Sequence, residues 1–210
     1  MIDFPASTIV RRRLPKEAFY KHLPLSAALK QKFVSDVDRI TVENSLTKGN
    51  LNLAKDSEIN EILLLSIILK KQDFDGKIVE AIARQNPHKL IFMLVYDDER
   101  QLAVYHSKLY RTDWTKENKL SLTLAGNTLD EIWDDLVRQI AVSSEAVLKQ
   151  EGQTIDEQLK TQDEIDRLNT LIKRIEAAAW KEQQPKKKFE LYTRLQEYKK
   201  QLEEITNGKA

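Results

Sequence analysis

Alternating and continuous apolar runs in the middle of the chain predict a mixed sheet. The longest run, ILLLSIIL at Ile62–Leu69, is typical of a strand covered on both faces. An apolar stripe at Ile78–Ala83 then indicates a helix that Pro87 ends, and HKLIFMLVYDDERQLAVYHSKLYRTDW predicts two strands around the turn Asp97–Arg100. A helical crossover joins parallel strands and a tight turn joins antiparallel ones, so we expect an α/β or α+β core with a mixed β-sheet.

The first part of the chain predicts helices that pack on one face of this sheet. Pro15 begins a short helix, and Ser26 precedes a longer one. The longer helix has apolar positions at helical spacing: Leu29, Phe33, Val37 and Ile40. The next segment, RITVENSLTKGNLNL, is rich in β-branched residues around the turn-forming residues 48–50, and it indicates a strand or a hairpin at the sheet edge.

A further amphipathic helix is expected to close the core. It begins after Asn127 and Thr128, which are good N-cap residues. Its apolar side consists of Leu129, Ile132, Trp133, Leu136, Val137 and Ile140. We therefore predict a core domain at residues 1–148, followed by a polar linker, KQEGQTIDEQ.

The C-terminal part, residues 160–207, predicts a helical arm. One apolar run is Leu168, Ile172, Ile175 and Ala179, and a second is Leu191, Leu195, Tyr198, Leu202 and Ile205. The two runs do not share one seam, and Pro185 lies between them. An antiparallel helical hairpin with Pro185 in the first turn of its second helix explains both features, whereas a single kinked helix or coiled coil is the competing geometry.

Composition narrows the possible functions. The 210 residues include 34 Lys and Arg against 33 Asp and Glu, so the net charge of +1 gives no general attraction to nucleic acid or an acidic membrane. The chain has no cysteine, which excludes disulfides and thiolate metal sites and fits a reducing compartment. The longest apolar run is far shorter than the roughly 20 residues that span a bilayer. We expect a soluble cytoplasmic protein that does not bind membranes.

Motifs for catalysis are missing. The five glycines form no phosphate-binding loop or dinucleotide fingerprint, and no G-x-S-x-G nucleophile elbow occurs. The three histidines, His22, His88 and His106, lack the spacing of a zinc site. We therefore expect no catalytic residues, no metal and no cofactor, and we interpret His88 and the tryptophans as mainly structural residues.

One enzymatic alternative is a metal-dependent nuclease. Glu58 and Glu61 precede the buried strand, and Lys70 and Lys71 follow it, so carboxylates and a lysine could hold Mg²⁺ and orient water. Such enzymes usually have an acidic residue two positions before the lysine, but Ile68 stands there. Asp73 or Asp75 more often caps the following helix. A nuclease would therefore be degenerate.

Three stretches carry a family resemblance: FPASTIVRRRLPKEAFY, NPHKLIFMLVYDD and EIDRLNTLIKRIEAAAWKEQQPKKKFELYTRLQEYKKQLEEI. The chain resembles an uncharacterised bacterial family, domain of unknown function 4391. Its members are commonly encoded beside helicases and DNA methyltransferases in restriction-like defence loci, which implies an accessory role in antiviral defence. Ile68 and Pro185 depart from the family pattern; the first weakens any inherited metal site and the second favours the hairpin.

These observations lead to two non-enzymatic hypotheses. In the first, the protein is an accessory or adaptor protein whose arm docks on a helicase or methyltransferase, and a homodimer through the arm stays open. The expected partner-binding residues are Trp180, Leu191, Leu195, Tyr198 and Leu202. In the second, the protein is a nucleic-acid-binding module, for example a DNA-binding one, that contacts phosphate through two basic clusters. These clusters are Arg11, Arg12 and Arg13, and Lys186, Lys187 and Lys188.

Overall fold

The protein folds as two compact units, residues 1–141 and 142–210. This arrangement comes from a computed structural model, which describes residues 2–15, 17, 25–148 and 152–207. The sequence placed the end of the first domain near Leu148. The division instead follows Ala141, because the short helix α5 (Glu145–Leu148) packs against α6 of the second unit.

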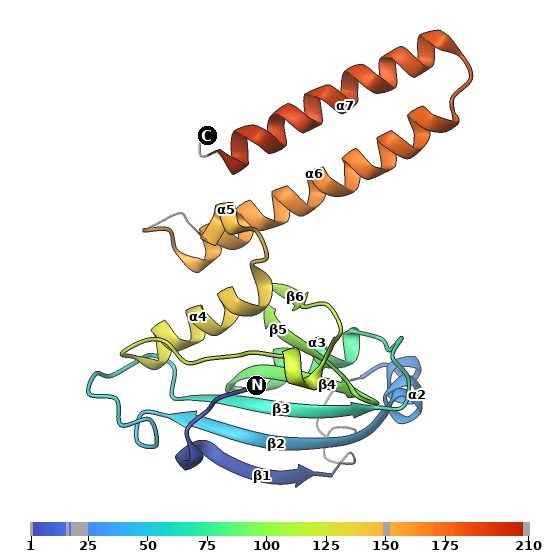
Figure 1. The fold of residues 1–210 in the computed structure, drawn as a ribbon. Coiled ribbons are helices and arrows are strands. Elements are labelled where there is room, and N and C mark those ends of the chain that lie inside the picture. The colour runs from blue at the N-terminus through green and yellow to red at the C-terminus, as the bar shows by residue number, and fades with distance from the viewer. Residues whose placement is uncertain (1, 16, 18–24, 149–151, 208–210) are drawn as a thin grey trace. The chain divides into compact units, whose positions relative to one another are not determined.

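The first unit contains a mixed seven-stranded sheet, as predicted (Figure 1). Its strand order is β1-β2-β3-β4-β5-β6, and β7 also pairs with β5. The pair β3 and β4 is parallel and joined by helix α3, whereas the other neighbours are antiparallel. The strands are β1 (Ile9–Leu14), β2 (Val37–Thr47), β3 (Glu61–Leu69), β4 (Lys89–Tyr96), β5 (Glu99–His106), β6 (Lys108–Arg111) and β7 (Thr115–Lys116).

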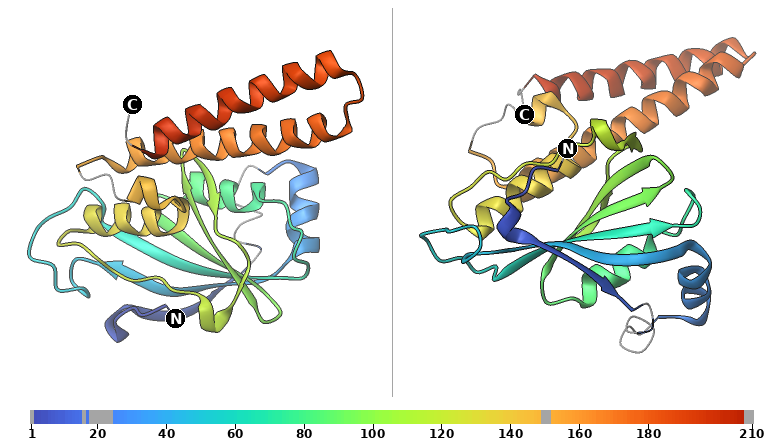
Figure 2. Two further views of the ribbon diagram at one scale, coloured as in Figure 1. Left: turned by 45° about the horizontal axis from the view of Figure 1, so that its top comes forward. Right: turned by 60° about the horizontal axis from the view of Figure 1, so that its bottom comes forward.

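Helices cover both faces of this sheet (Figure 2). On one face, α2 (Ala27–Asp36) and α3 (Lys77–Gln85) pack over a core that includes Phe33, Leu65 and Phe92. On the other face, α4 (Leu129–Ala141) contacts β3, β5 and β6. Short 3₁₀ helices, η1 (Ala6–Thr8) and η2 (Glu117–Lys119), lie in the connections. The continuous apolar run of β3 is thus explained, because both of its faces are covered.

The helix α4 matches its prediction closely. All six apolar residues expected on its inner side are buried. The hydroxyl of Thr128 accepts a hydrogen bond from the backbone N–H of Glu131 (3.1 Å), so Thr128 caps the helix as its sequence indicated. The helix predicted at Ile78–Ala83 is α3, and the predicted turn joins the antiparallel strands β4 and β5, so both predictions are confirmed.

The N-terminal region differs from the prediction in two respects. The helix capped by Ser26 ends at Asp36, so Val37 and Ile40 belong to β2 and not to a helical stripe. β2 is also not an edge strand, because Ile9–Leu14 form β1 beside it. Val37 and Ile40 fit the apolar spacing of a helix and also lie in a strand. The β-branched residues that follow Asp36 favour the strand. The short helix predicted after Pro15 falls on residues 16 and 18–24, outside the described residues.

The second unit is an antiparallel helical hairpin. Helix α6 (Ile155–Lys181) and helix α7 (Pro185–Thr206) pack side by side and are joined by residues 182–184 (Figure 1). Pro185 occupies the first turn of α7, where its missing N–H needs no partner. The predicted hairpin is therefore confirmed, and a single kinked helix is excluded.

The first helix of the hairpin begins earlier than predicted. Thr154 and Glu157 form a capping box, in which each side chain accepts a hydrogen bond from the backbone N–H of the other residue. The helix therefore starts at Ile155 and includes the last residues of the predicted linker. Its buried residues are Ile155, Gln158, Leu159, Gln162, Ile165, Leu168, Ile172 and Ala179.

Candidate functional site

The apolar seam of α7 serves the hairpin itself. Leu195 is only 4% exposed, and Leu191, Tyr198 and Leu202 are half-buried. These residues recur every three or four positions and therefore share one side of α7, which packs against α6. Of the five residues predicted to bind a partner, these four stabilise the hairpin. Leu195 would be available to a partner only if the hairpin opened.

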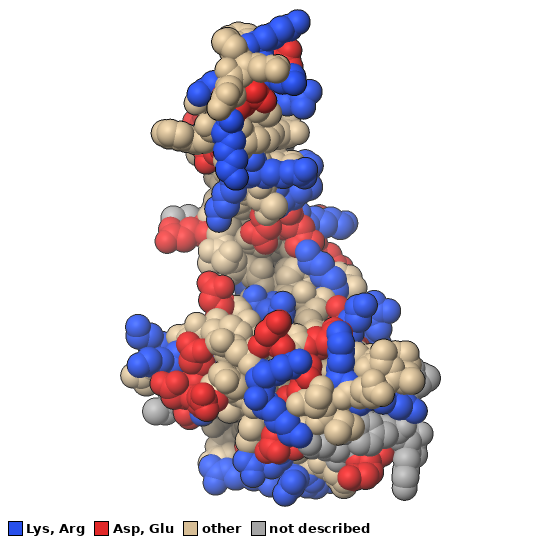
Figure 3. All heavy atoms as spheres, turned by 90° about the vertical axis from the view of Figure 1, so that its right-hand side faces the viewer, with Lys and Arg blue, Asp and Glu red and all other residues tan. Residues whose placement is uncertain are grey.

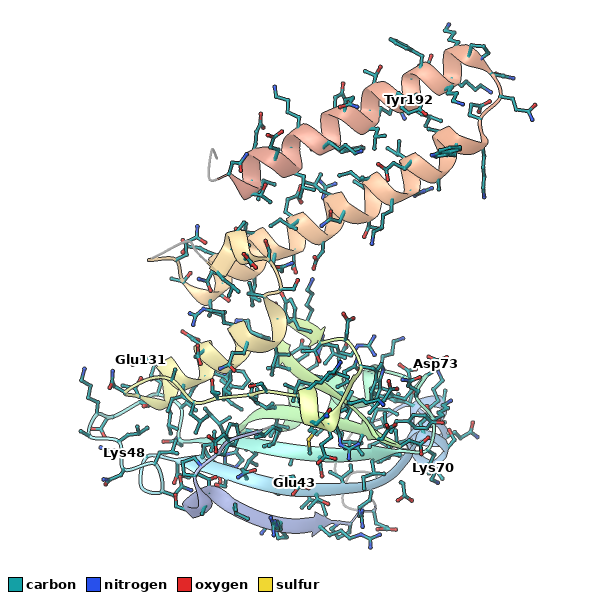
Figure 4. The ribbon with its side chains drawn as sticks, viewed as in Figure 1. Glu43, Lys48, Lys70, Asp73, Glu131 and Tyr192 are labelled. Atoms are coloured by element: carbon teal, nitrogen blue, oxygen red, sulfur yellow. The ribbon has the colours of Figure 1, made fainter. Side chains whose placement is uncertain are left out.

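Three aromatic side chains near the connection between the helices are exposed. Trp180 is 84% exposed, Phe189 74% and Tyr192 43%. Figure 4 shows Tyr192 in the half of α7 that is nearer to this connection. At about 100° per residue, Phe189 lies about 120° around α7 from Leu195, and Tyr192 lies about 60° from it, at the border of the seam. We call Trp180, Phe189 and Tyr192, with the lysines 186–188, the aromatic tip.

Lysines dominate the charge at this tip. Lys186, Lys187 and Lys188 lie at the start of α7, where the first turn contains no acidic residue; Lys186 and Lys187 are exposed and Lys188 is half-buried. Figure 3 shows lysine and arginine side chains gathered on this part of the hairpin. Positive side chains are unfavourable at a helix N-terminus, where the helix dipole is itself positive, by about 0.3–1 kcal/mol each. The lysines therefore do not stabilise α7, which is consistent with a role in binding.

The exposed aromatic pair was missed from the sequence. Phe189 directly follows the lysines and Tyr192 lies three residues further on, and both are exposed, but neither was predicted from the sequence to bind a ligand. A signal was present for Phe189, which lies about 120° around the helix from Leu195 and therefore off the apolar seam, whereas Tyr192 borders the seam. Trp133, in contrast, is buried in α4, and Trp114 packs against the core, as expected of structural tryptophans.

The N-terminal basic cluster does not form one surface. Arg11, Arg12 and Arg13 all lie in β1, but Arg11 and Arg13 line different recesses of the surface. Arg13 shares a surface recess with the acidic residues Glu17 and Asp38. Arg11 has a left-handed backbone (φ 49°) and lines a different pocket. The three arginines belong to the first unit and Lys186–Lys188 to the second.

The residues of the nuclease alternative are not brought together. Glu61 begins β3 and Lys70 follows its end, so about 30 Å of strand separates them at about 3.3 Å per residue. Glu61 accepts a hydrogen bond from Ser45 and lies 3.1 Å from His88 Nδ1, while Lys70 Nζ donates to the carbonyl of Val34 (3.0 Å; Figure 4 labels Lys70). Glu61 and Lys70 therefore cannot act together at one Mg²⁺ site.

Asp75 has the capping role that its position indicated. Its Oδ1 accepts a hydrogen bond from the backbone N–H of Lys77 (3.0 Å) at the start of α3, and its Oδ2 pairs with Lys32 (2.7 Å). The hydrogen bond from Lys32 is the main cause that lowers the pKa of Asp75. Within the described parts of the chain, no three His, Asp or Glu side chains gather closely enough to hold a metal ion.

A buried carboxylate joins α2 to the end of β3. Asp36 is 1% exposed; its Oδ1 accepts hydrogen bonds from Ser35 (2.5 Å) and from Lys71 Nζ (2.9 Å). Burial acts to raise the pKa of Asp36, but these hydrogen bonds and the charge of Lys71 together outweigh it, so the pKa is lowered. This ion pair ties the end of α2 to the residues that follow β3.

Comparison with known proteins identifies the family and nothing more specific. The model of the family described as "Domain of unknown function (DUF4391)" matches residues 2–202, so the chain belongs to this family. Neither the curated proteins nor the solved structures contain a significant match. No helix within the described residues has the length and hydrophobicity needed to cross a membrane.

Proposed function

We propose that this family member is a non-enzymatic adaptor that docks on a partner protein through the aromatic tip of its hairpin. The observation that carries the proposal is the exposure of Trp180 and Phe189, at 84% and 74%. Following what the family resemblance implies, the expected partner is a helicase or DNA methyltransferase of a defence system. Trp180, which the sequence also indicated as a partner-binding residue, belongs to this surface, whereas the α7 seam packs within the hairpin.

The fold gives these aromatic side chains no role of its own. Water surrounds most of each ring, so neither contributes much packing energy to the hairpin. In protein interfaces, tryptophan and tyrosine are enriched among the few residues that carry most of the binding free energy, often at 2 kcal/mol or more each. Burial of Trp180 and Phe189 in a partner's pockets would supply that contribution.

The charge around the rings indicates the chemistry of the partner. The three lysines that precede Phe189 give the tip a positive potential, so an acidic surface with apolar pockets is complementary to it. Charges at an interface rim mainly raise the association rate and select the partner, whereas buried aromatic rings hold the complex together. We therefore assign affinity to the rings and orientation to the lysines.

A protein partner fits this surface better than nucleic acid does. Successive residues of a helix are about 100° apart, so Lys186, Lys187 and Lys188 point in three directions and form no continuous track for a phosphate backbone. Glu182 and Glu190 interrupt the basic segment on either side of them. The tip has the composition of an interface hot spot with a charged rim.

The test is a tagged purification from the native host at physiological salt, with and without nuclease, followed by mass spectrometry. The double variant Trp180→Ser/Phe189→Ser is compared with the wild type and with a matched control, Thr193→Ala/Gln196→Ala, on exposed positions of the same hairpin. We expect a stoichiometric helicase or methyltransferase that survives nuclease treatment and is lost only from the aromatic double variant. Equal recovery of the partner by that variant would overturn the proposal.

Nucleic-acid binding is the second candidate, because lysines next to exposed aromatic rings also suit stacked bases. If it is correct, affinity for single-stranded DNA falls steeply as salt rises, and the triple variant Lys186→Glu/Lys187→Glu/Lys188→Glu flattens that slope. A protein partner that resists nuclease, together with no measurable DNA affinity at physiological salt, argues against this candidate.

A further inference from the structure

A pocket in the first unit is lined by three charged side chains, Arg11, Glu43 and Glu117. Glu117 pairs with Arg100 (2.8 Å), and among the described residues no ion pair joins Arg11 to Glu43. The volume of the pocket is about 650 Å³, within the range of small-molecule sites, and Glu43 of β2 and Arg11 of β1 both line it. Apolar side chains contribute much of the remaining wall, together with the polar residues Asn44 and Asn118; the apolar residues are Ile2, Phe4, Ile9, Leu64, Met93 and Leu120. Figure 4 labels Glu43 on the sheet. This site is separate from the aromatic tip.

Irregular strand pairing brings Arg11 and Glu43 together. Between the pairs Ile9↔Asn44 and Arg12↔Val42, two residues of β1 oppose Glu43 alone, so β1 has a bulge at Arg11. The pairing of β2 with β3 also shifts between Val42 and Asn44, so that no residue of β3 lies opposite Glu43. Bulges change the direction of a side chain and are common beside binding sites.

The bulge holds the backbone of Arg11 in a conformation that is unfavourable for any residue except glycine. A φ of 49° is the left-handed region, which costs a non-glycine residue of order 1 kcal/mol. Such strain is concentrated at ligand sites, where the surrounding structure holds the residue in place. Glycine would adopt this conformation without strain. An arginine at this position costs free energy, and what it provides in return is its guanidinium group.

Glu43 is a half-buried acceptor with capacity for a ligand. Among the described residues, one of its oxygens accepts a hydrogen bond from Ser66 Oγ (2.5 Å), and no ion pair neutralises the carboxylate. A carboxylate that is partly removed from water gains from a cationic or N–H partner. The pocket therefore has a receptor for a cation and, across the bulge, a receptor for an anion.

The walls of the pocket are held in place by hydrogen bonds. Asn44, which is buried, donates to Thr8 Oγ1 (2.8 Å), and Thr8 in turn donates to the carbonyl of Pro5 (2.7 Å). The N–H of Asp3 donates to the carbonyl of Leu122 (3.3 Å), next to a bridge between Ile2 and Leu122. These bonds fix the N-terminal segment over the sheet, so the pocket is part of the folded unit.

We infer that this pocket binds a small zwitterion with an apolar body, of the chemical class of an apolar α-amino acid. Its ammonium group pairs with Glu43, its carboxylate pairs with Arg11, and its side chain lies against Leu64 and Met93. The ammonium and carboxylate groups of an α-amino acid are bonded to the same carbon. This close spacing suits Glu43 and Arg11, which face each other on adjacent strands. A neutral apolar ligand would leave both protein charges unpaired.

The test measures binding to the full-length protein by saturation-transfer NMR and calorimetry. The probes are L-phenylalanine, phenethylamine, which lacks the carboxylate, and 3-phenylpropionate, which lacks the ammonium group. We expect only L-phenylalanine to bind measurably, and Glu43→Gln or Arg11→Gly to weaken it by about tenfold or more, as loss of a charge-assisted hydrogen bond does. Arg11→Gly keeps the backbone conformation that φ 49° requires.

Controls separate this result from unfolding. Arg12→Ala removes a neighbouring arginine that does not line the pocket and leaves binding unchanged. Met93→Trp fills the pocket and abolishes binding. If none of the three probes binds, or if all three bind equally, or if the Glu43 and Arg11 variants bind like the wild type, the inference is overturned. Thermal denaturation of each variant shows that it is folded under the conditions of the binding assay.

Discussion

The two units of this protein place their aromatic residues in opposite ways. In the sheet unit, Phe33 and Phe92 are completely buried between the sheet and its helices. In the hairpin, Trp180 and Phe189 are largely exposed, while the buried positions of its described residues, such as Ala179 and Leu195, include no aromatic ring. The same kind of side chain therefore stabilises the fold in one unit and is available for binding in the other.

This difference follows from geometry. A sheet with helices on both faces has room for large rings between its layers, whereas two helices in contact have space only for smaller side chains along one seam. Rings on the outer sides of a two-helix hairpin stay in water unless another molecule covers them. The comparison predicts that equivalent substitutions affect folding in the sheet unit and binding in the hairpin.

The largest effect is expected for Phe92→Ala. Truncation of this fully buried ring leaves a cavity in the core, and we expect the free energy of unfolding to fall by about 3–5 kcal/mol. Urea unfolding followed by fluorescence measures it. Phe92→Leu, which keeps most of the volume, is the control and should cost clearly less. A loss below about 1 kcal/mol for Phe92→Ala would contradict the assignment of this core.

The next effect is expected for Leu195→Ala, which removes the most buried residue of the α7 seam. We expect a local loss of about 2–3 kcal/mol within the hairpin, because the cavity opens between two helices that can partly collapse. Hydrogen exchange should increase in α6 and α7 and stay unchanged in β3. Gln196→Ala, on an exposed position of α7, is the control. Increased exchange in β3 would show that the two units do not unfold separately.

A smaller effect depends on pH. The lowered pKa of Asp36 means that its ionised form stabilises the native state, so this contribution is complete above the ordinary pKa of about 3.8 and is lost as pH falls through the lower native value. Asp36→Asn should reduce the free energy of unfolding by about 1–2 kcal/mol at neutral pH. The gap between wild type and variant should narrow below about pH 3.8. A gap that is independent of pH would contradict the ionic role.

The smallest effect on stability is expected for Phe189→Ala. Because this ring is mostly in water, we expect a change of less than about 0.5 kcal/mol, against several for the same substitution at Phe92. Urea unfolding tests both variants under the same conditions. A loss above about 1 kcal/mol would show that Phe189 packs within the hairpin in solution, and the aromatic tip would then be a structural feature.

Local signals in the sequence were sufficient for most of the elements. The apolar run at Ile62–Leu69 identified β3, Thr128 identified the start of α4, and Pro185 identified the start of α7. Prediction was less successful where two periods overlapped. Val37 and Ile40 satisfy both a helix and a strand, and only the pairing of β2 with β1 and β3 selects the strand. Long-range pairing energy is not encoded in the local pattern.

The candidate sites also divide into features that the local sequence indicates and features that depend on packing. The lysine cluster and Trp180 were visible in the sequence as a basic turn with a neighbouring aromatic residue, but their exposure was not. The apparent partner residues Leu191 and Leu195 were identified by their spacing, and spacing alone cannot tell whether an apolar stripe faces another helix of the same chain or a different protein. The packing of α6 against α7 decided this.

The sequence by itself determined the mixed sheet, the hairpin and the absence of familiar catalytic motifs, because periodicity, capping residues and proline act over a few neighbouring positions. Only the tertiary structure decided that Glu61 and Lys70 lie at opposite ends of one strand, that Arg11 and Glu43 share a pocket, and that Phe189 is exposed. Each of these facts depends on strand register or on helix packing. Register and packing are set by contacts between residues far apart in the chain, and no local pattern specifies them.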